Sequence, residues 1–351
     1  MERAWDALER GEPRKALGSL AGRIPAAMAC ERDFLAAEAW RAMGYFAKAE
    51  ALYRRVLPRA DAGRDLRADS AAALASICRS LGRVNLARAF LRRARNLFGN
   101  NTARENRRRL ELEEALIERA QGLYPQSLRR FKVLLSVFAA EKDFASAAFV
   151  LWAMGGARRF SGDLRGALAD FKSSLAFARR AADKTAEAYA LLGMGGAARV
   201  AGRPADSELY YARAARLLSG TEDVFGQAYA ECGLANALRQ KGDYARAGRR
   251  YKRAHRLYAS IGDAVDLAYV DWGLGQVAFH LGNPEGARRR FEAALAAFEK
   301  AGEARGAVIS LTALAAVLHS SGRTHAAEAL FRRALRESCR AKIHAHLEAL
   351  T

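Results

Sequence analysis

Small, apolar and polar positions recur along the chain with a period of about forty residues. A marker glycine occurs at one fixed place in each period. Successive marker glycines are 40 residues apart from Gly82 onward, and the two spacings before Gly82 are 38 and 33 residues. The marker glycines are Gly11, Gly44, Gly82, Gly122, Gly162, Gly202, Gly242, Gly282 and Gly322. Glycine adopts the positive φ that commonly ends a helix, so each marker is expected in a turn between two helices.

The residues around each marker follow a helical pattern. Five residues after it stands alanine or serine, nine after it a large apolar residue, and seven before it a very small one. A small residue lets two helices approach closely, and the large residue fills the gap between them. The large residues are Tyr53, Leu91, Phe131, Phe171, Tyr211, Tyr251, Phe291 and Phe331; the small ones are Ala37, Ala75, Ala115, Gly155, Gly195, Ala235, Gly275 and Ala315.

The composition favours an all-α protein. Alanine, leucine, arginine and glutamate dominate, there are 6 prolines, and runs of β-branched residues are missing. A hydrophobic fraction of 51% excludes wholesale disorder. No stretch of 18 uncharged apolar residues occurs, so we expect no membrane insertion. Four widely separated cysteines and an N-terminus without an apolar signal core predict a cytoplasmic protein with reduced thiols.

These residues resemble the tetratricopeptide repeat. The best matches are Gly242-Asp243-Tyr244 followed by Ala247, Tyr251 and Ala254, and Gly282-Asn283-Pro284 followed by Ala287, Phe291 and Ala294. The period of forty resembles the longer-helix variety found in polarity adaptors and in bacterial signalling regulators.

The resemblance implies a right-handed superhelical solenoid of about nine helix-turn-helix repeats, whose first helices line a concave groove. Acidic residues ahead of the first helices are expected as N-caps or first-turn charges: Asp143, Asp183, Asp223, Asp263 and Glu303. Residues after Glu337, including Ile343 and Leu347, are expected to form a C-terminal capping helix. We predict one repeat domain over 1–351. An irregular joint is expected near 100–118, where Glu114 occupies an apolar position.

The net charge of +20 calls for an anionic partner: nucleic acid, acidic protein or a membrane surface. Part of this charge falls at one repeat position, three residues before the marker glycine. We call its six arginines the arginine column: Arg41, Arg79, Arg119, Arg159, Arg199 and Arg239. Phe279 and His319 hold the same position in the last two repeats.

Aromatic and amide side chains fall near the arginine column. Helical geometry groups it with further candidates for partner binding: Trp152, Trp272, Tyr189, Tyr229, Tyr269, Asn236 and Gln276, with Phe149 in the tyrosine position of one repeat. Arginine binds carboxylates and phosphates in bidentate fashion, and tyrosine or tryptophan beside arginine is typical of interaction hot spots. In the alternative interpretation the arginines are structural, bonding helix-end carbonyls or pairing with acids of the next repeat, and the tyrosines pack in the core.

Two functions remain open from the sequence. We predict a non-catalytic adaptor that binds an acidic peptide or protein segment in its arginine-lined groove; the alternative is a nucleic-acid-binding solenoid. We expect no cofactor and no metal site. Gly193-Met194-Gly195-Gly196 falls inside a predicted helix, and His255, His280, His319 and His325 lack acidic or nucleophilic partners at a repeated offset.

Overall fold

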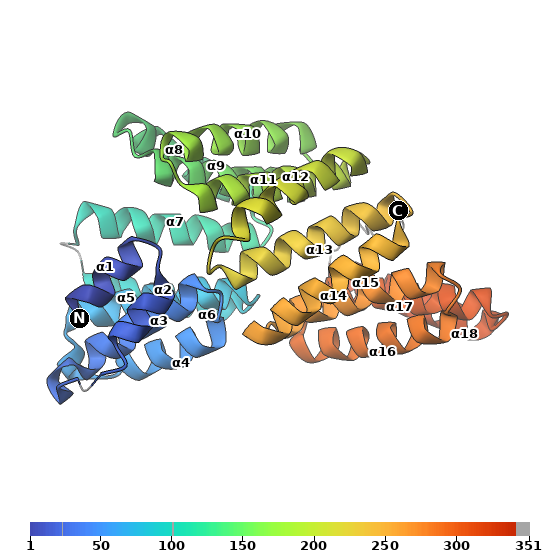
Figure 1. Cartoon of the computed structure of the whole chain (residues 1–351), viewed down its shortest axis with the longest axis horizontal. Helices are drawn as coiled ribbons and strands as arrows, with labels where there is room; N and C mark the ends of the chain where they lie inside the picture. The colour runs from blue at the N-terminus through green and yellow to red at the C-terminus, as the bar shows by residue number, and fades with distance from the viewer. Residues whose placement is uncertain (23, 100–101, 342–351) are drawn as a thin grey trace. The chain divides into compact units, whose positions relative to one another are not determined.

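The structure is a computed structural model that describes residues 1–22, 24–99 and 102–341. Within these residues the chain forms α-helices joined by short turns, with two single 3₁₀ turns, Ala26–Met28 and Ala60–Ala62. The helices are α1 Glu2–Glu9, α2 Pro13–Ser19, α3 Ala29–Ala42, α4 Phe46–Val56, α5 Arg64–Ser80, α6 Val84–Phe98, α7 Arg104–Ala120, α8 Tyr124–Ala140, α9 Phe144–Phe160, α10 Leu164–Arg180, α11 Lys184–Val200, α12 Pro204–Leu218, α13 Val224–Gln240, α14 Tyr244–Ile261, α15 Ala264–His280, α16 Pro284–Ala301, α17 Ala304–Ser320 and α18 Thr324–Arg340. Figure 1 shows them in chain order.

Each marker glycine lies in the turn between an odd-numbered helix and the even-numbered helix that follows. All nine have a positive φ, between 69° and 92°. The residue after the glycine caps the second helix in several pairs: Asp163, Asp243 and Asn283 each accept a hydrogen bond from the backbone N–H three residues on. The predicted all-α array of helix pairs is confirmed for the part of the chain that the structure describes.

The acidic residues ahead of the first helices also act as predicted. Asp143, Asp183, Asp263 and Glu303 each accept a hydrogen bond from the backbone N–H three residues further on. Asp223, in the same repeat position, accepts a hydrogen bond from the Tyr189 hydroxyl at 2.9 Å. The predicted capping helix lies outside the described residues: α18 ends at Arg340, and neither Ile343 nor Leu347 is described.

The chain divides into two compact units. Unit 1 comprises Met1–Ala190 and Gly220–Phe225, and unit 2 comprises Leu191–Ser219 with the described residues from Gly226 onward. Two compact units can belong to one repeat domain, so the single domain expected over 1–351 stays a prediction. At the expected irregular joint α7 is a regular helix, and Glu114 pairs with Arg95 of α6 at 3.0 Å.

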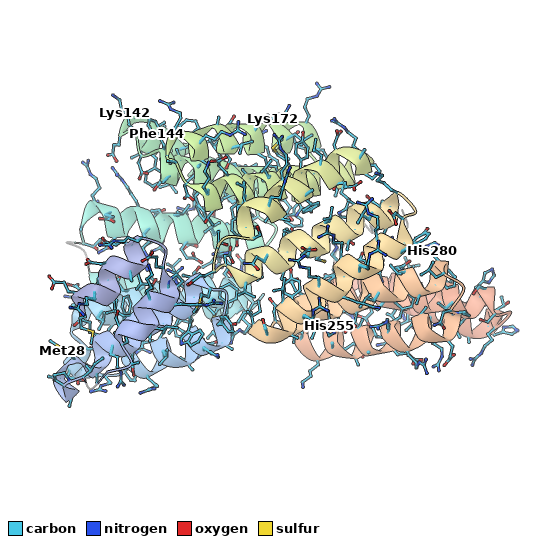
Figure 2. The ribbon with its side chains drawn as sticks, viewed as in Figure 1. Met28, Lys142, Phe144, Lys172, His255 and His280 are labelled. Carbon is cyan, nitrogen blue, oxygen red and sulfur yellow. The ribbon has the colours of Figure 1, made fainter. Side chains whose placement is uncertain are left out.

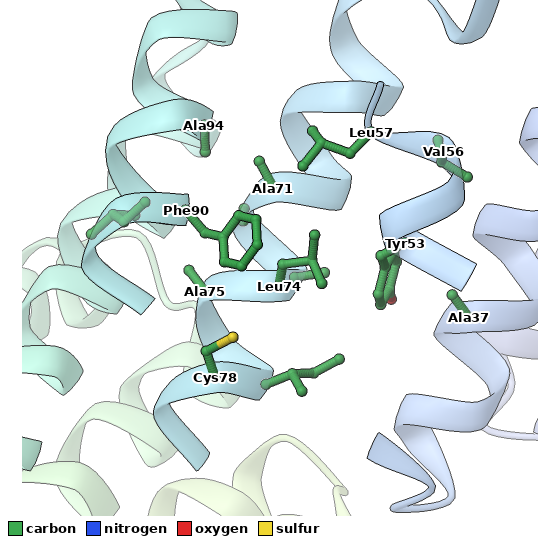
Figure 3. Close-up of a cluster of buried hydrophobic side chains, with 14 of the residues drawn as sticks. Ala37, Tyr53, Val56, Leu57, Ala71, Leu74, Ala75, Cys78, Phe90 and Ala94 are labelled. Carbon is green, nitrogen blue, oxygen red and sulfur yellow. The ribbon is translucent and has the colours of Figure 1, made fainter. Parts of the chain in front are cut away.

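The core of each unit is built from the large residues of the second helices. Tyr53, Phe131, Tyr211, Tyr251 and Phe291 are at most 2% exposed. Figure 3 shows the first such layer in unit 1, where Tyr53 has Ala37 of its own pair on one side and Leu74 of the next pair on the other. Phe331 of α18 is 43% exposed, since no further pair follows it among the described residues.

Small residues of two neighbouring first helices make room for one aromatic ring. A Cβ added at Gly195 of α11 would lie 2.9 Å from the Tyr211 ring, and one added at Gly233 of α13 would lie 2.1 Å from it. Gly155 and Gly275 stand in the same relation to Phe171 and Phe291. The predicted pairing of a small residue with a large one is therefore confirmed, and the next first helix contributes a second small residue.

Ion pairs within a helix pair add a second repeated contact. Arg130, Arg250 and Arg290 of the second helices pair with acids of the first helices 19 residues earlier: Glu111 at 2.7 Å, Glu231 at 3.1 Å and Asp271 at 2.9 Å. Where the second helix carries Asp170 or Tyr210 at this position, the first helix carries leucine, Leu151 or Leu191. Thus, in these two repeats, where the second helix lacks arginine at this position, the first helix lacks the acid as well.

Unit 2 contains a pair of close carboxyl groups at the start of α15. The Asp266 backbone N–H donates to Asp263 Oδ1 at 3.0 Å. Burial and the nearby Asp263 carboxylate raise the pKa of Asp266 to about 7, although the Tyr258 hydroxyl bonds to it. The folded state therefore holds the Asp266 proton more tightly than the unfolded state, where the pKa is about 3.9.

Replacing Gly233 with alanine tests the wedge between the helices. We expect Gly233→Ala to lower the free energy of unfolding by about 1–3 kcal/mol, because its methyl group overlaps the Tyr211 ring. The control is Gly248→Ala on α14, where a Cβ would meet Val277 at an ordinary 3.4 Å. That variant should gain up to about 1 kcal/mol from helix propensity. Urea denaturation measures the free energy of unfolding of both variants. Equal stabilisation by the two substitutions would contradict close packing of the Tyr211 ring against Gly233.

The raised pKa of Asp266 predicts a pH-dependent stability. The proton favours folding below about pH 4, and this contribution is lost as the pH rises through about 7. Asp266→Asn cannot ionise, so the variant should melt at a higher temperature than the wild type at pH 8.5. The difference should narrow towards pH 5. Thermal unfolding across this range is the measurement, and a difference that does not change with pH would contradict the prediction.

Candidate functional site

The first helices of unit 1 line two neighbouring hollows. The first has a volume of about 660 Å³ and is lined by residues of α1, α3, α5 and α7, with Phe149 of α9 at its edge. The second has a volume of about 450 Å³ and lies mainly between α5, α9 and α11, closed by Phe46 and Phe225. We call the two together the unit 1 groove. Arg41, Arg79 and Phe149 line both hollows.

Phe225, at the end of segment 220–225, forms part of the wall of the second hollow. Phe225 packs on Phe46 with ring centroids 5.6 Å apart, and Glu222 accepts a hydrogen bond from the Arg14 backbone N–H at 2.8 Å. Gly44 allows this approach, since a Cβ there would lie 2.6 Å from Phe225 Cβ. Sequence reasoning missed this wall, because it joins residues about two hundred positions apart.

The arginine column splits into two kinds of environment in unit 1. Arg41 pairs with Glu38, which also accepts a hydrogen bond from the Tyr53 hydroxyl. Arg79 donates to Glu113 of the next first helix at 2.7 Å and is largely buried. A carboxylate therefore meets each of these two guanidinium groups. Arg79 has the acid of the next repeat that the structural interpretation names, whereas Arg41 has one on its own helix.

Arg119 and Arg159 have aromatic rings rather than carboxylates as neighbours. The Arg119 guanidinium lies over the Trp152 ring, 5.3 Å from its centroid, and donates to the Ala153 carbonyl at 3.4 Å. Arg159 lies 4.3 Å from the Phe160 ring centroid. Among the described residues, no carboxylate forms an ion pair with either arginine.

The electrostatic environment of Arg119 is unfavourable for a cation. The side chain is half-buried, and its Nη1 would be 2.9 Å from a Cβ at Gly156, so glycine makes the room it occupies. Burial and the nearby charges of Arg79 and Arg159 lower the pKa of Arg119 to about 9. At neutral pH the guanidinium is still charged, and an anion beside it would relieve both effects.

The aromatic candidates of unit 1 form one connected wall. Phe149 and Trp152 are 5.6 Å apart between ring centroids, and Trp152 meets Tyr189 edge-on at 6.0 Å. Trp152 and Tyr189 line the second hollow, and Phe149 is 41% exposed. The Tyr189 hydroxyl donates to Asp223, so its polar end is held by the following helix start.

The matching candidates of unit 2 are engaged in packing. Arg239 is buried and lies 5.3 Å from the centroid of Trp272, which is itself buried and donates to the Ile309 carbonyl at 3.3 Å. Asn236 accepts from the Tyr251 hydroxyl at 2.6 Å, and Tyr269 donates to Glu303 at 2.9 Å. The remaining candidates are half-buried on their helices: Arg199, Tyr229 and Gln276.

The sequence analysis missed Glu113 and missed the contacts that Asp223 and Glu303 make with tyrosines, since it named these two acids only as caps or first-turn charges. Glu113 stands 34 residues after Arg79, and the same separation joins Tyr189 to Asp223 and Tyr269 to Glu303. A search for complementary residues at this separation could have found all three contacts. Glu38, one turn before Arg41, is a local pair of the ordinary helical kind.

Two of the histidines named in the sequence analysis contact side chains near them. Figure 2 shows His255 on α14 and His280 at the end of α15. His255 lies 3.9 Å from Asp271, and the His280 ring stacks on Tyr244 at 4.5 Å. Within the described ranges no three His, Cys, Asp or Glu side chains gather as they would around a metal ion. No helix in those ranges is long and apolar enough to cross a bilayer.

Comparisons with known proteins support the repeat fold. Residues 265–336 match the family model described as tetratricopeptide repeat. No curated protein matches the chain. Among solved structures, a Rap protein in complex with competence and sporulation factor superposes with a TM-score of 0.60 at 14% identity, covering 78% of this chain and 76% of that one. The apo form of RapI gives 0.60 at 11% identity, covering 77% and 97%.

A third structure extends the likeness over more of the chain. A signal transduction ATPase with numerous domains from Pyrococcus horikoshii, with a tetratricopeptide repeat sensor, gives a TM-score of 0.60 at 14% identity. The match covers 95% of this chain and 54% of that chain. Likeness at such identities concerns the fold alone. The family match identifies residues 265–336 as tetratricopeptide repeats, and the likeness in fold extends the same kind of helix-pair array along the chain.

Proposed function

We propose that this protein is a non-catalytic adaptor that binds an acidic segment of another protein in the unit 1 groove. The observation that carries the proposal is the pair Arg119 and Arg159, two half-buried cations near the ends of α7 and α9, helices whose other residues line the groove. No carboxylate of the described residues forms an ion pair with either. A buried charge without a counter-ion is costly, and a carboxylate from a partner would form charge-assisted hydrogen bonds with it.

The shape and composition of the groove support a protein partner. First helices of successive pairs line it, so an extended segment can cross several repeats. Exposed Phe149 and half-buried Trp152 lie on its surface, and aromatic side chains next to arginine commonly dominate protein interfaces. The similar Rap protein was crystallised with competence and sporulation factor, which is consistent with a binding role for this fold. The four free cysteines fit our proposal of a cytoplasmic protein.

Nucleic acid is the second candidate partner, and a different surface favours it. Helix α14 has no acidic residue, and Arg249, Lys252 and Arg256 are exposed along one face of it. Among the described residues no carboxylate pairs with these three side chains. Such a face attracts phosphates by charge alone, without reading a base sequence.

A pair of neutral substitutions tests the adaptor function. We expect Arg119→Gln with Arg159→Gln to weaken capture of the native partner about tenfold or more, since charge-assisted hydrogen bonds are lost. The control is Arg92→Gln with Arg93→Gln on α6, two exposed arginines whose loss changes the net charge equally. Cross-linked purification from the native source, followed by binding measurements on the captured protein, compares the variants. Equal capture by both would reject the groove, and capture of nothing by the wild type would reject the adaptor.

A salt titration separates the nucleic-acid alternative from generic attraction. Labelled single-stranded RNA and DNA are titrated with the protein at rising salt concentration, and fluorescence anisotropy reports binding. If the adaptor function is right, affinity should fall steeply with salt and show no preference between sequences. Arg249→Gln with Lys252→Gln should remove most of it. Tight, sequence-selective binding at physiological salt would favour the nucleic-acid function instead.

A further inference from the structure

The second hollow of unit 1 has a composition unlike the rest of the groove. Aromatic rings from four helices border it, namely Phe46 of α4, Phe149 and Trp152 of α9, Tyr189 of α11 and Phe225 of α13. Alanines and Leu116 complete the apolar part of the lining, and its polar members are Arg41, Arg79, Asp183, Thr185, Ser76, Ser80 and Ser174. A concave, mostly apolar site with few polar groups is the usual form of a ligand pocket.

The size of this hollow fits a small part of a ligand. Its volume of about 450 Å³ is near the lower end of the roughly 300–1,000 Å³ typical of pockets that bind small molecules. It therefore accommodates an aromatic side chain with its flanking backbone rather than a whole folded element. Phe149 is 41% exposed at its edge, and a large exposed ring beside a hollow marks a contact surface.

The charge around the hollow selects an anion over a cation. An aromatic pocket with free carboxylates would suit a cation, but the acids near this one already have partners. Asp183 caps α11, Asp223 accepts from Tyr189, and Glu113 pairs with Arg79. The uncompensated charge nearby is positive.

Arg119 is placed to supply that positive charge to the hollow. Arg119 is not itself a lining residue, but it follows the lining residue Leu116 by three positions on α7, and its guanidinium covers the ring of Trp152, another lining residue. Arg79 lines the hollow itself and lies close enough to Arg119 to affect its ionisation. Arg79 already has Glu113 as its partner, so Arg119 is the cation that an anionic group at the hollow would pair with.

From this arrangement we infer that the second hollow is an anchor pocket for an aromatic side chain of the partner segment, with an adjacent carboxylate bound by Arg119. The inference rests on the proposed adaptor function and narrows it from any acidic segment to one in which glutamate or aspartate neighbours an aromatic residue. The ring packs against Phe149 and Trp152, and the carboxylate replaces the missing counter-ion of Arg119.

Short peptides provide the probe. Acetylated and amidated tetrapeptides containing Glu-Phe or Phe-Glu between glycines are compared with their Gln-Phe and Glu-Ala counterparts. Binding is measured by displacement of 8-anilinonaphthalene-1-sulfonate, a fluorescent aromatic anion that suits the same pocket. We expect at least one order of Glu and Phe to bind about tenfold or more tightly than either counterpart. Equal binding of the counterparts overturns the inference.

Two matched pairs of protein variants locate the site. Phe149→Ala should abolish the preference for phenylalanine, whereas Phe331→Ala, which removes a ring of nearly equal exposure (43%) on α18, should not. Arg119→Gln should abolish the preference for glutamate, whereas Arg92→Gln should not. Melting curves confirm that each variant folds. If Phe149→Ala and Phe331→Ala bind the peptides alike, the pocket is elsewhere and the inference fails.

The peptide assay is independent of partner capture, so the two proposals fail separately. Capture of a native partner without any peptide preference rejects the anchor pocket and leaves the adaptor function standing. A peptide preference that depends on Phe149 and Arg119, without capture of any protein, supports the pocket chemistry and rejects the adaptor function.

Discussion

The fold depends on one contact that is repeated along the chain, in which a large side chain is wedged between small residues of two first helices. Tyr211 shows it most clearly, because Gly195 of its own pair and Gly233 of the next leave no space for a side chain against its ring. This contact holds the two helices of a pair together and also holds that pair against the next one. The same side chain therefore stabilises both the repeat unit and the stacking of successive units. Close packing of this kind tolerates little added volume.

Stacking at this spacing places Arg79, Arg119 and Arg239 of the column beside the first helix of the following pair. The residues of that helix nearest the arginine decide whether its guanidinium forms an ion pair or stacks on an aromatic ring. Arg79 meets Glu113 and becomes half of an ion pair, whereas Arg119 meets Trp152 and Gly156 and stacks on a ring. Arg239 meets Trp272 in the same geometry but is buried with it. A repeated residue therefore has different roles because its neighbour is not repeated.

The candidate site arises from this mismatch between repeat and neighbour. Carboxylates satisfy Arg41 and Arg79, while Arg119 and Arg159 lie beside aromatic rings and repel one another. Arg119 stacks on Trp152, which lines a hollow bordered by aromatic rings and by Asp183, an acid that is already bonded. Desolvated positive charge beside exposed aromatic surface is an arrangement that gains from a ligand with complementary charge and apolar area.

The sequence by itself determined the helix pairs, their turns, their caps and their buried rings, because these depend on spacings within about forty residues. Gly155 and Phe171 could be matched on helical geometry alone, as could the capping acid Asp263. The composition of the groove depended on tertiary structure. Phe225 closes the hollow against Phe46 from far along the chain, and Glu113 neutralises Arg79 from the next repeat. The column of six arginines was evident from the period. Which of these arginines form an ion pair depends on the residues that the neighbouring helices place beside them, and these are known only from the tertiary structure.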